Sequence, residues 1–208
     1  MAEAPIFIYP NKSKKNPRLD IVQQVMNTYF DRRLGVDLGW DYHPLATRIA
    51  DSGLTADFRK DFGGLIVQAE VQFGNMARWY SDVFKFQTAY SQGLINLGLS
   101  IVPSRGLAVR IDSNIVNFER AVRELPSAEL SITLPILLIG LAQDENTEVV
   151  DLRQTKFRKV SQITGKGKEE NRWRVVNGYL GNRDVSGIGP RSPTGTMPSL
   201  QANNGEEE

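Results

Sequence analysis

The sequence predicts a single α/β domain with helices on both faces of a mixed central sheet. Short apolar runs rich in β-branched residues alternate with segments whose apolar residues recur every three or four positions, as when strands alternate with helices. Residues 65–67, 75–92 and 94–102 give a strand, a helix and a second strand in that order. Such a unit joins parallel neighbours. A chain of 208 residues is long enough for one domain with a sizeable core.

Composition narrows the function classes. Hydrophobic residues make up 40% and charged residues 24% of the chain, as in ordinary globular proteins. The net charge of +1 requires any nucleic-acid binding to use a local basic surface. The absence of cysteine excludes disulfides, thiolate metal sites and a cysteine nucleophile. With no signal pattern and no apolar run of membrane-spanning length, we expect a cytoplasmic protein that does not enter a membrane.

The N-terminal part is predicted to hold one helix before a hairpin. A short apolar patch at residues 6–9 is followed by a basic loop at 11–18, whose lysines are either solvated or in contact with nucleic-acid phosphates. Helical spacing predicts an amphipathic helix over 19–34, and residues 54–58 are predicted to form a strand. His43 is the only histidine and lacks partners for a zinc site. We expect a structural or surface role for it, with a substrate-phosphate contact as the alternative.

The hairpin carries the chemistry. Residues 65–67 are predicted to form a buried strand after a tight turn at Gly63-Gly64. Glu70 and Gln72 then share one face of the strand, because residues two apart point the same way. Asp61 lies across the turn and is expected to fold back beside Glu70. Two carboxylates and an amide are suitable ligands for Mg²⁺, which can polarise a phosphate and activate water.

Each of these side chains also has a simpler interpretation. Asp61 alone is a turn-forming residue, and Asp57, at a strand end in Ala56-Asp57-Phe58, is its rival as first metal ligand. Glu70 as an ordinary exposed residue is disfavoured, because an unpaired charge between apolar neighbours is costly. Lys85, on the helix predicted over 75–92, is expected to be a solvated charge, with a role in catalysis as the alternative.

The pattern Asp61-x8-Glu70-x-Gln72, followed by Phe73-Gly74-Asn75, resembles the active-site hairpin of BglII-type restriction endonucleases. These enzymes belong to the PD-(D/E)XK nuclease superfamily and have Gln where most members have Lys. The resemblance covers roughly residues 45–165 and implies the PD-(D/E)XK fold. It implies that Asp61, Glu70 and Gln72 are catalytic and that the two acids bind Mg²⁺. It also implies a homodimer that cuts double-stranded DNA at a palindromic site with a GATC core.

The remaining chain supplies candidate DNA contacts. We expect a loop over 104–114, a helix over 117–125 and a core strand over 130–141, with Pro135 marking a bent or edge section. Asn75 is expected to cap the helix and, by the resemblance, to face DNA bases. Ser113 and Asn114 either contact bases or cap the next helix.

A basic segment follows at residues 153–174. Its dense positive charge suits DNA phosphates, although a solvated face is the alternative. The residues that we assign to DNA binding here are Arg153, Lys156, Arg158 and Lys159. Residues 1–182 are predicted to form the endonuclease domain. Residues 183–208, rich in Gly, Pro, Ser and Asn, are predicted to be a disordered tail.

The function predicted from these features is that of a type II restriction endonuclease that hydrolyses DNA with Mg²⁺ and no organic cofactor. Gln72 would orient water but cannot act as a base, because an amide has no suitable pKa. One alternative is a DNA-repair nuclease of the same superfamily that nicks as a monomer. The others are a non-catalytic DNA-binding protein on a nuclease scaffold and a purely structural α/β protein.

Overall fold

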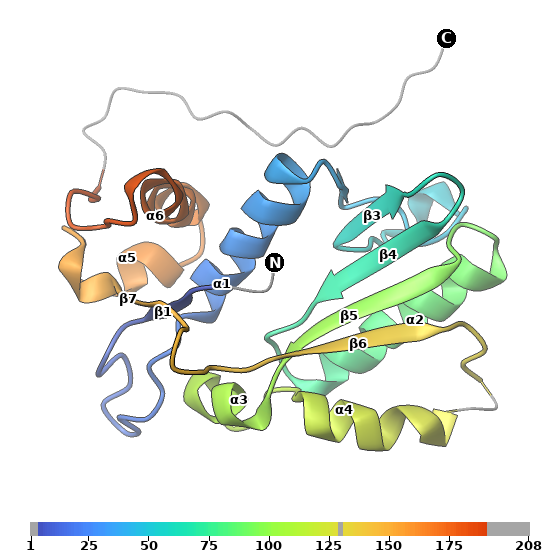
Figure 1. Ribbon diagram of the computed structural model, residues 1–208, viewed down its shortest axis with the longest axis horizontal. Helices are drawn as coiled ribbons and strands as arrows, with labels where there is room; N and C mark the ends of the chain where they lie inside the picture. Colours follow the sequence, from blue (N-terminus) through green and yellow to red (C-terminus); the bar gives the residue numbers. More distant parts are fainter. Residues whose placement is uncertain (1–3, 129–130, 191–208) are drawn as a thin grey trace, which may run out of the picture.

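A five-stranded mixed sheet forms the centre of the molecule (Figure 1). The computed structural model describes residues 4–128 and 131–190. The sheet order is β2-β3-β4-β5-β6. Its strands are β2 (Asp41–Tyr42), β3 (Phe58–Asp61), β4 (Ile66–Val71), β5 (Leu97–Pro103) and β6 (Ile136–Leu141). β2, β3 and β4 pair antiparallel, whereas β4, β5 and β6 pair parallel. The predicted mixed sheet and the parallel pairing across the strand–helix–strand unit are confirmed.

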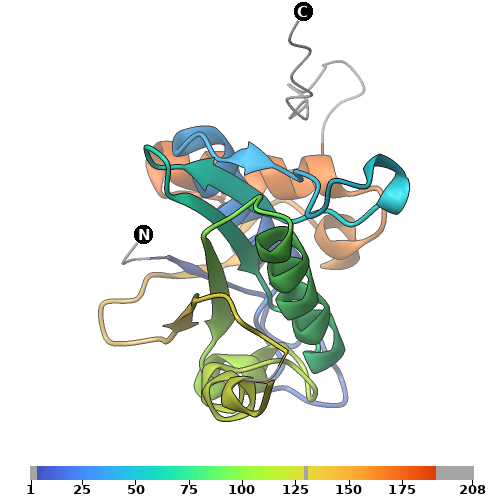
Figure 2. The same cartoon turned by 90° about the vertical axis from the view of Figure 1, so that its right-hand side faces the viewer.

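Helices cover both faces of this sheet (Figures 1 and 2). One face carries α2 (Met76–Ser91), and α4 (Phe118–Glu124) packs on β6 beside it. The other carries α1 (Gln23–Phe30), which continues as a π-helix over Asp31–Asp37. On the side of α1 away from the central sheet lie α5 (Ser161–Thr164) and α6 (Glu169–Asn182), next to a small parallel sheet of β1 (Ile6–Ile8) and β7 (Val149–Asp151). Short 3-10 helices occur at Ala50–Ser52, Leu125–Ala128 and Leu152–Gln154.

Strand β4 separates the two sides by the alternation of its side chains. Val67, Ala69 and Val71 belong to the core that includes α1 and α6. Gln68 and Glu70 point the opposite way, toward α2, and both have 0% exposure. Burying two polar residues on one strand is costly unless each finds a partner. This position therefore needs a polar network, which is described below.

Three local predictions differ from the structure. The helix predicted from residue 19 begins at Gln23, because the backbone N–H groups of Asp20 and Ile21 bond to the carbonyl of Arg110 instead. Residues Arg105–Ile111 form helix α3 within the predicted loop, and its apolar side packs into the core. Strand β3 begins at Phe58, where the predicted strand ended.

The predicted boundary of the tail is also wrong. Val185 is 2% exposed and belongs to the main core. The carbonyl of Ile188 accepts a hydrogen bond from the backbone N–H of Lys156 at 2.7 Å. Residues 183–190 are therefore part of the packed body, while 191–208 lie outside the described residues. Across the described chain, every helix is too short or too polar to cross a membrane.

Candidate active site

The predicted tight turn at Gly63-Gly64 is present in the β3–β4 hairpin, but Asp61 does not lie where the sequence predicted. Gly63 and Gly64 have φ values of +72° and +99°, as a two-residue type I′ hairpin turn requires. Asp61 pairs with Ile66 directly across this turn, and its exposed carboxylate accepts a hydrogen bond from the N–H of Gly64 at 2.6 Å. Glu70 lies four residues further along β4, about 13 Å away at the usual strand rise. Asp61 does not fold back beside Glu70.

Asp57 takes that position instead. Phe58 pairs with Ala69, so the preceding residue, Asp57, lies opposite Glu70 with its side chain on the same face of the sheet. Its Oδ2 accepts a hydrogen bond from the N–H of Val71 at 2.9 Å. The rival of Asp61 is therefore the aspartate that the fold brings to Glu70.

Glu70 is held on both carboxylate oxygens. Oε1 accepts a hydrogen bond from Nε2 of Gln68 at 3.1 Å, and Oε2 accepts one from Nζ of Lys85 at 2.6 Å. Lys85 comes from α2, and its side chain is only 12% exposed. The expectation of a solvated lysine is wrong. The helical pattern alone did not show that this residue meets the carboxylates.

The network continues to a third carboxylate and to the predicted Gln72. Asp82 on α2 forms an ion pair with Nζ of Lys85 at 2.8 Å through Oδ1. Its Oδ2 accepts a hydrogen bond from Nε2 of Gln72 at 2.7 Å. The other end of the Gln72 amide, Oε1, accepts the N–H of Gly74 at 2.8 Å. Both ends of the Gln72 amide are thus hydrogen-bonded within the protein.

The electrostatics of this cluster favour binding of a cation. Burial and then the charges of Asp57 and Asp82 raise the pKa of Glu70, although Lys85 acts in the opposite direction. Burial is also the main cause that raises the pKa of Asp57 to about 6. Burial alone would lower the pKa of Lys85, yet its bonds to Glu70 and Asp82 raise it. One ammonium therefore lies among three carboxyl groups, and an added cation would stabilise their charged forms.

This donor set suits a divalent ion with a water-rich coordination shell. In residues 4–128 and 131–190, no three acidic or histidine side chains are placed to hold a metal ion by themselves. Mg²⁺ commonly uses only one or two carboxylates, with water and phosphate oxygens completing the shell. Asp57 and Glu70 meet that requirement. The Oδ1 atom of Asp57 accepts no hydrogen bond from the described part of the chain.

His43 lies at the edge of the cluster. Its N–H donates to the carbonyl of Asp57 at 3.0 Å, and its ring stacks on Tyr42 with centroids 3.8 Å apart. The backbone φ of +53° is in the left-handed region, which is uncommon for a residue other than glycine. Burial, followed by the charge of Lys85, lowers its pKa. His43 is exposed, as a structural or surface role predicts, and it also lies next to Asp57.

The fold also brings the predicted base-contacting residues together. Asn75 caps α2 through a bond from the N–H of Arg78 to its Oδ1 at 3.0 Å, so its predicted capping role is confirmed. An isolated bridge pairs Asn75 with Ile115, immediately after Ser113 and Asn114. All three predicted side chains are exposed. They form one surface at the end of β4 that carries Glu70.

The predicted basic residues fall into two kinds. Lys156, Arg158 and Lys159 are exposed, on either side of the buried Phe157. Arg153 is exposed too, but its guanidinium forms an ion pair with Asp151. The earlier basic loop is tied down through Lys12, whose ammonium bonds to the carbonyls of Ile21 and Ile111.

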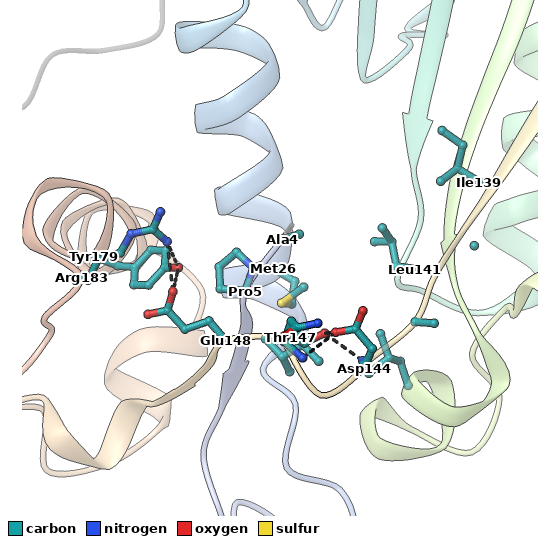
Figure 3. Close-up of a pocket in the computed structure, with 15 residues that line it drawn as sticks. Ala4, Pro5, Met26, Ile139, Leu141, Asp144, Thr147, Glu148, Tyr179 and Arg183 are labelled. Atoms are coloured by element: carbon teal, nitrogen blue, oxygen red, sulfur yellow. Dashed lines mark hydrogen bonds and ion pairs between the residues drawn. The ribbon is translucent and has the colours of Figure 1, made fainter. Parts of the chain in front are cut away.

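A cavity of about 830 Å³ lies away from this cluster, beside the other side of the sheet (Figure 3). Ile139 and Leu141 of β6 and Met26 of α1 line its apolar part. In its polar part, the carboxylate of Glu148 binds the Tyr179 hydroxyl at 2.7 Å and Arg183 at 3.1 Å. These charged groups already satisfy one another. We therefore place the candidate active site at the carboxylate cluster.

Comparisons with known proteins bear on the family and the fold. The sequence profile of the family described as restriction endonuclease BglII/BglIII matches residues 6–141. A crystal structure of restriction endonuclease BglII complexed with a DNA 16-mer is similar, with a TM-score of 0.57 and 19% sequence identity. The similarity covers 69% of this chain and 67% of that chain, and it shows the PD-(D/E)XK fold. A search of curated proteins gives no match.

Proposed function

Because the chain belongs to the BglII/BglIII family of restriction endonucleases, we propose that it is a type II enzyme that hydrolyses double-stranded DNA with Mg²⁺. The observation that carries this proposal is the meeting of Asp57 with Glu70 at the open end of the β3–β4 hairpin. Carboxylates that converge in a buried, negatively charged cluster are typical of functional sites.

Asp57 and Glu70 are the proposed metal ligands, in place of the pair Asp61 and Glu70 expected from the sequence. The N–H of Val71 fixes the orientation of Asp57, and the amide of Gln68 fixes Glu70. When bound there, Mg²⁺ supplies a Lewis acid for the phosphate and lowers the pKa of attacking water. The protein contributes two carboxylates that these hydrogen bonds hold in place.

Gln72 is proposed to position the site rather than to orient water. Its two amide bonds, to Asp82 and to Gly74, join α2 to the turn that precedes it. An amide cannot accept the proton of water in any case. A methyl group on Gly74 would lie 2.5 Å from Oε1 of Gln72. The close approach of this amide to the backbone therefore depends on glycine at residue 74.

DNA contacts are proposed for the predicted residues that remain exposed. Asn75, Ser113 and Asn114 would contact base edges, because amide and hydroxyl groups suit such hydrogen bonding. Lys156, Arg158 and Lys159 would contact phosphates, which position the protein without reading sequence. Arg153 would contribute less, because Asp151 already neutralises it.

The proposed DNA sequence specificity is based on the resemblance to BglII-type enzymes. We propose a palindromic site with a GATC core, cut with 5′ overhangs. A homodimer would place one active site on each DNA strand, because its two-fold symmetry matches that of a palindromic recognition sequence. The enzyme would act on DNA in the cytoplasm.

The test is incubation of the purified protein with DNA from a host that lacks DNA methyltransferases, with Mg²⁺ or with EDTA. We expect discrete double-strand fragments with Mg²⁺ only, and sequencing of their ends should give a GATC-containing site. Ends without GATC would contradict that specificity and leave the nuclease intact. Nicked circles alone would favour the repair nuclease, and a gel shift without cleavage in any divalent ion would favour a DNA-binding protein without catalysis.

A further inference from the structure

Helix α2 brings an ammonium group into the carboxylate cluster. Nζ of Lys85 lies 2.6 Å from Oε2 of Glu70 and 2.8 Å from Oδ1 of Asp82. This lysine lies within α2 and not on strand β4. The ammonium therefore reaches the face of the sheet where Asp57 also lies.

Stability alone explains this arrangement poorly. A buried ion pair commonly contributes little compared with apolar residues of the same volume, because both charges lose their hydration. Phe86, the next residue along α2, is fully buried, so this part of the helix packs through apolar side chains as well. A charged group at this position points to a role beyond packing.

The alternative groups at the site are already engaged. Gln72 uses both ends of its amide. The guanidinium of Arg59 reaches the carbonyl of Leu45 and the amide of Gln68 instead of a carboxylate. Within the described ranges of the chain, Lys85 is the only basic residue that forms an ion pair with Glu70 or Asp82.

We propose that Lys85 is a catalytic residue, and this inference rests on the nuclease function proposed above. In the resting protein its ammonium neutralises Glu70 and Asp82. When a divalent ion binds Asp57 and Glu70, the ammonium is released from Glu70 to contact the scissile phosphate. A lysine is suited to both positions, because its four-carbon stem is flexible and its charge is compact. A positive group next to the phosphate stabilises the negative charge that develops on it in the transition state.

The charges agree with this exchange. Three carboxyl groups, those of Asp57, Glu70 and Asp82, surround the one ammonium of Lys85, and a divalent ion bound there would replace the ammonium as the partner of Glu70. After that, Glu70 no longer needs the ammonium. The ion and Lys85 would therefore compete for Glu70, and removal of Lys85 should strengthen metal binding while it weakens catalysis.

The test compares the variant Lys85→Met with Lys60→Met, which makes the same change on β3 outside the cluster. Mn²⁺ affinity is measured without DNA, and the cleavage rate is measured at saturating Mn²⁺. We expect Lys85→Met to bind Mn²⁺ at least about tenfold more tightly, since a nearby positive charge is removed. We expect its saturated rate to fall by about 100-fold, on the scale of losing one preorganised electrostatic group. Lys60→Met should match the unsubstituted protein in both measurements.

A second variant separates catalysis from folding. Lys85→Met combined with Asp82→Asn keeps the net charge of the cluster, so it should fold even if the single variant does not. A saturated rate equal to that of the unsubstituted protein in either variant would overturn the inference and leave the nuclease function standing. Failure of the unsubstituted protein to cleave any DNA with Mg²⁺ or Mn²⁺ would instead overturn the proposed function. A slower saturated rate with tighter Mn²⁺ binding supports the catalytic role.

Discussion

The two ends of the β3–β4 hairpin each carry an aspartate, and their surroundings are opposite. Asp61, at the turn end, is exposed, and the N–H of Gly64 satisfies its carboxylate. Asp57, at the open end, is partly buried opposite Glu70 and has its pKa raised. One end satisfies its charge locally, whereas the other gathers charges that repel one another. The difference indicates that the open end is the functional one.

The pairing register decides which aspartate meets Glu70. A two-residue turn at Gly63-Gly64 fixes Asp61 opposite Ile66, and each earlier residue on β3 then meets a later residue on β4. Asp57 lies opposite Glu70 because it directly precedes β3, whose first residue, Phe58, pairs with Ala69. The spacing between two acids in the sequence cannot distinguish a short hairpin from a longer one with a different partner.

Replacing each of the two aspartates separately by asparagine is expected to give the largest difference in cleavage rate. Asp57→Asn should lower the cleavage rate by about 1,000-fold or more, because it removes a proposed metal ligand from a preorganised site. Asp61→Asn should cleave at the unsubstituted rate, since an amide oxygen can still accept the N–H of Gly64. The measurement is the single-turnover rate of cleavage with saturating Mg²⁺.

Both variants also need a binding control. DNA affinity in EDTA should be unchanged for each, which shows that they fold. A fully active Asp57→Asn protein together with an inactive Asp61→Asn protein would reverse the assignment and move the metal site to the turn end. The hairpin would then have to shift its register when it binds DNA.

The raised pKa of Asp31, which lies near Asp57, predicts that the free energy of unfolding depends on pH. Asp31, at the start of the π-helix, has its pKa raised to about 7, first by burial and then by the charge of Asp57. Between pH 4 and pH 7 the folded protein binds more protons here than the unfolded chain does, so this residue makes stability fall as pH rises. Asp31→Asn should therefore stabilise the metal-free protein by about 1–3 kcal/mol at pH 8 and change little at pH 4.

Urea unfolding in EDTA at several pH values measures this effect. The gain from Asp31→Asn should grow with pH across the interval from 4 to 7 and then level off. Asp61→Asn serves as the control, because its exposed carboxylate lies at the turn end. A gain that is the same at pH 4 and pH 8 would show that the charge of Asp31 is not the cause.

The sequence predicted the parts of the fold that depend on strong periodicity. The helix at α2 and its parallel flanking strands follow from apolar residues at helical spacing between two apolar runs. Helix α3 was missed because Gly106 and its short length weaken the pattern, although Leu107 and Ile111 pack into the core. Val185 was assigned to a tail because the composition around it is polar, yet its buried side chain and the backbone bond of Ile188 fix that segment.

The candidate site was predictable only in part. Glu70 stood out because it lies between apolar residues, where a charge needs partners. The choice between Asp57 and Asp61 required the strand register, which residue spacing does not contain. Lys85 required knowledge of which face of α2 meets the sheet. Periodicity shows that a helix has an apolar side but not which residues of another element lie opposite each position.

The smallest expected effect concerns the turn end. Gly64 has a φ of +99°, and a Cβ added there would contact no atom within 4 Å. Gly64→Ala should therefore destabilise the protein by about 1–2 kcal/mol through backbone strain alone, with cleavage unchanged below the melting temperature. Gly181→Ala, which is also uncrowded but in the regular backbone of α6, should be neutral or stabilising, because alanine favours helix.

Urea unfolding and cleavage rates measure both variants. A folded Gly64→Ala protein with slower cleavage would show that the turn end contributes to the reaction, and the contrast between the two ends of the hairpin would fail.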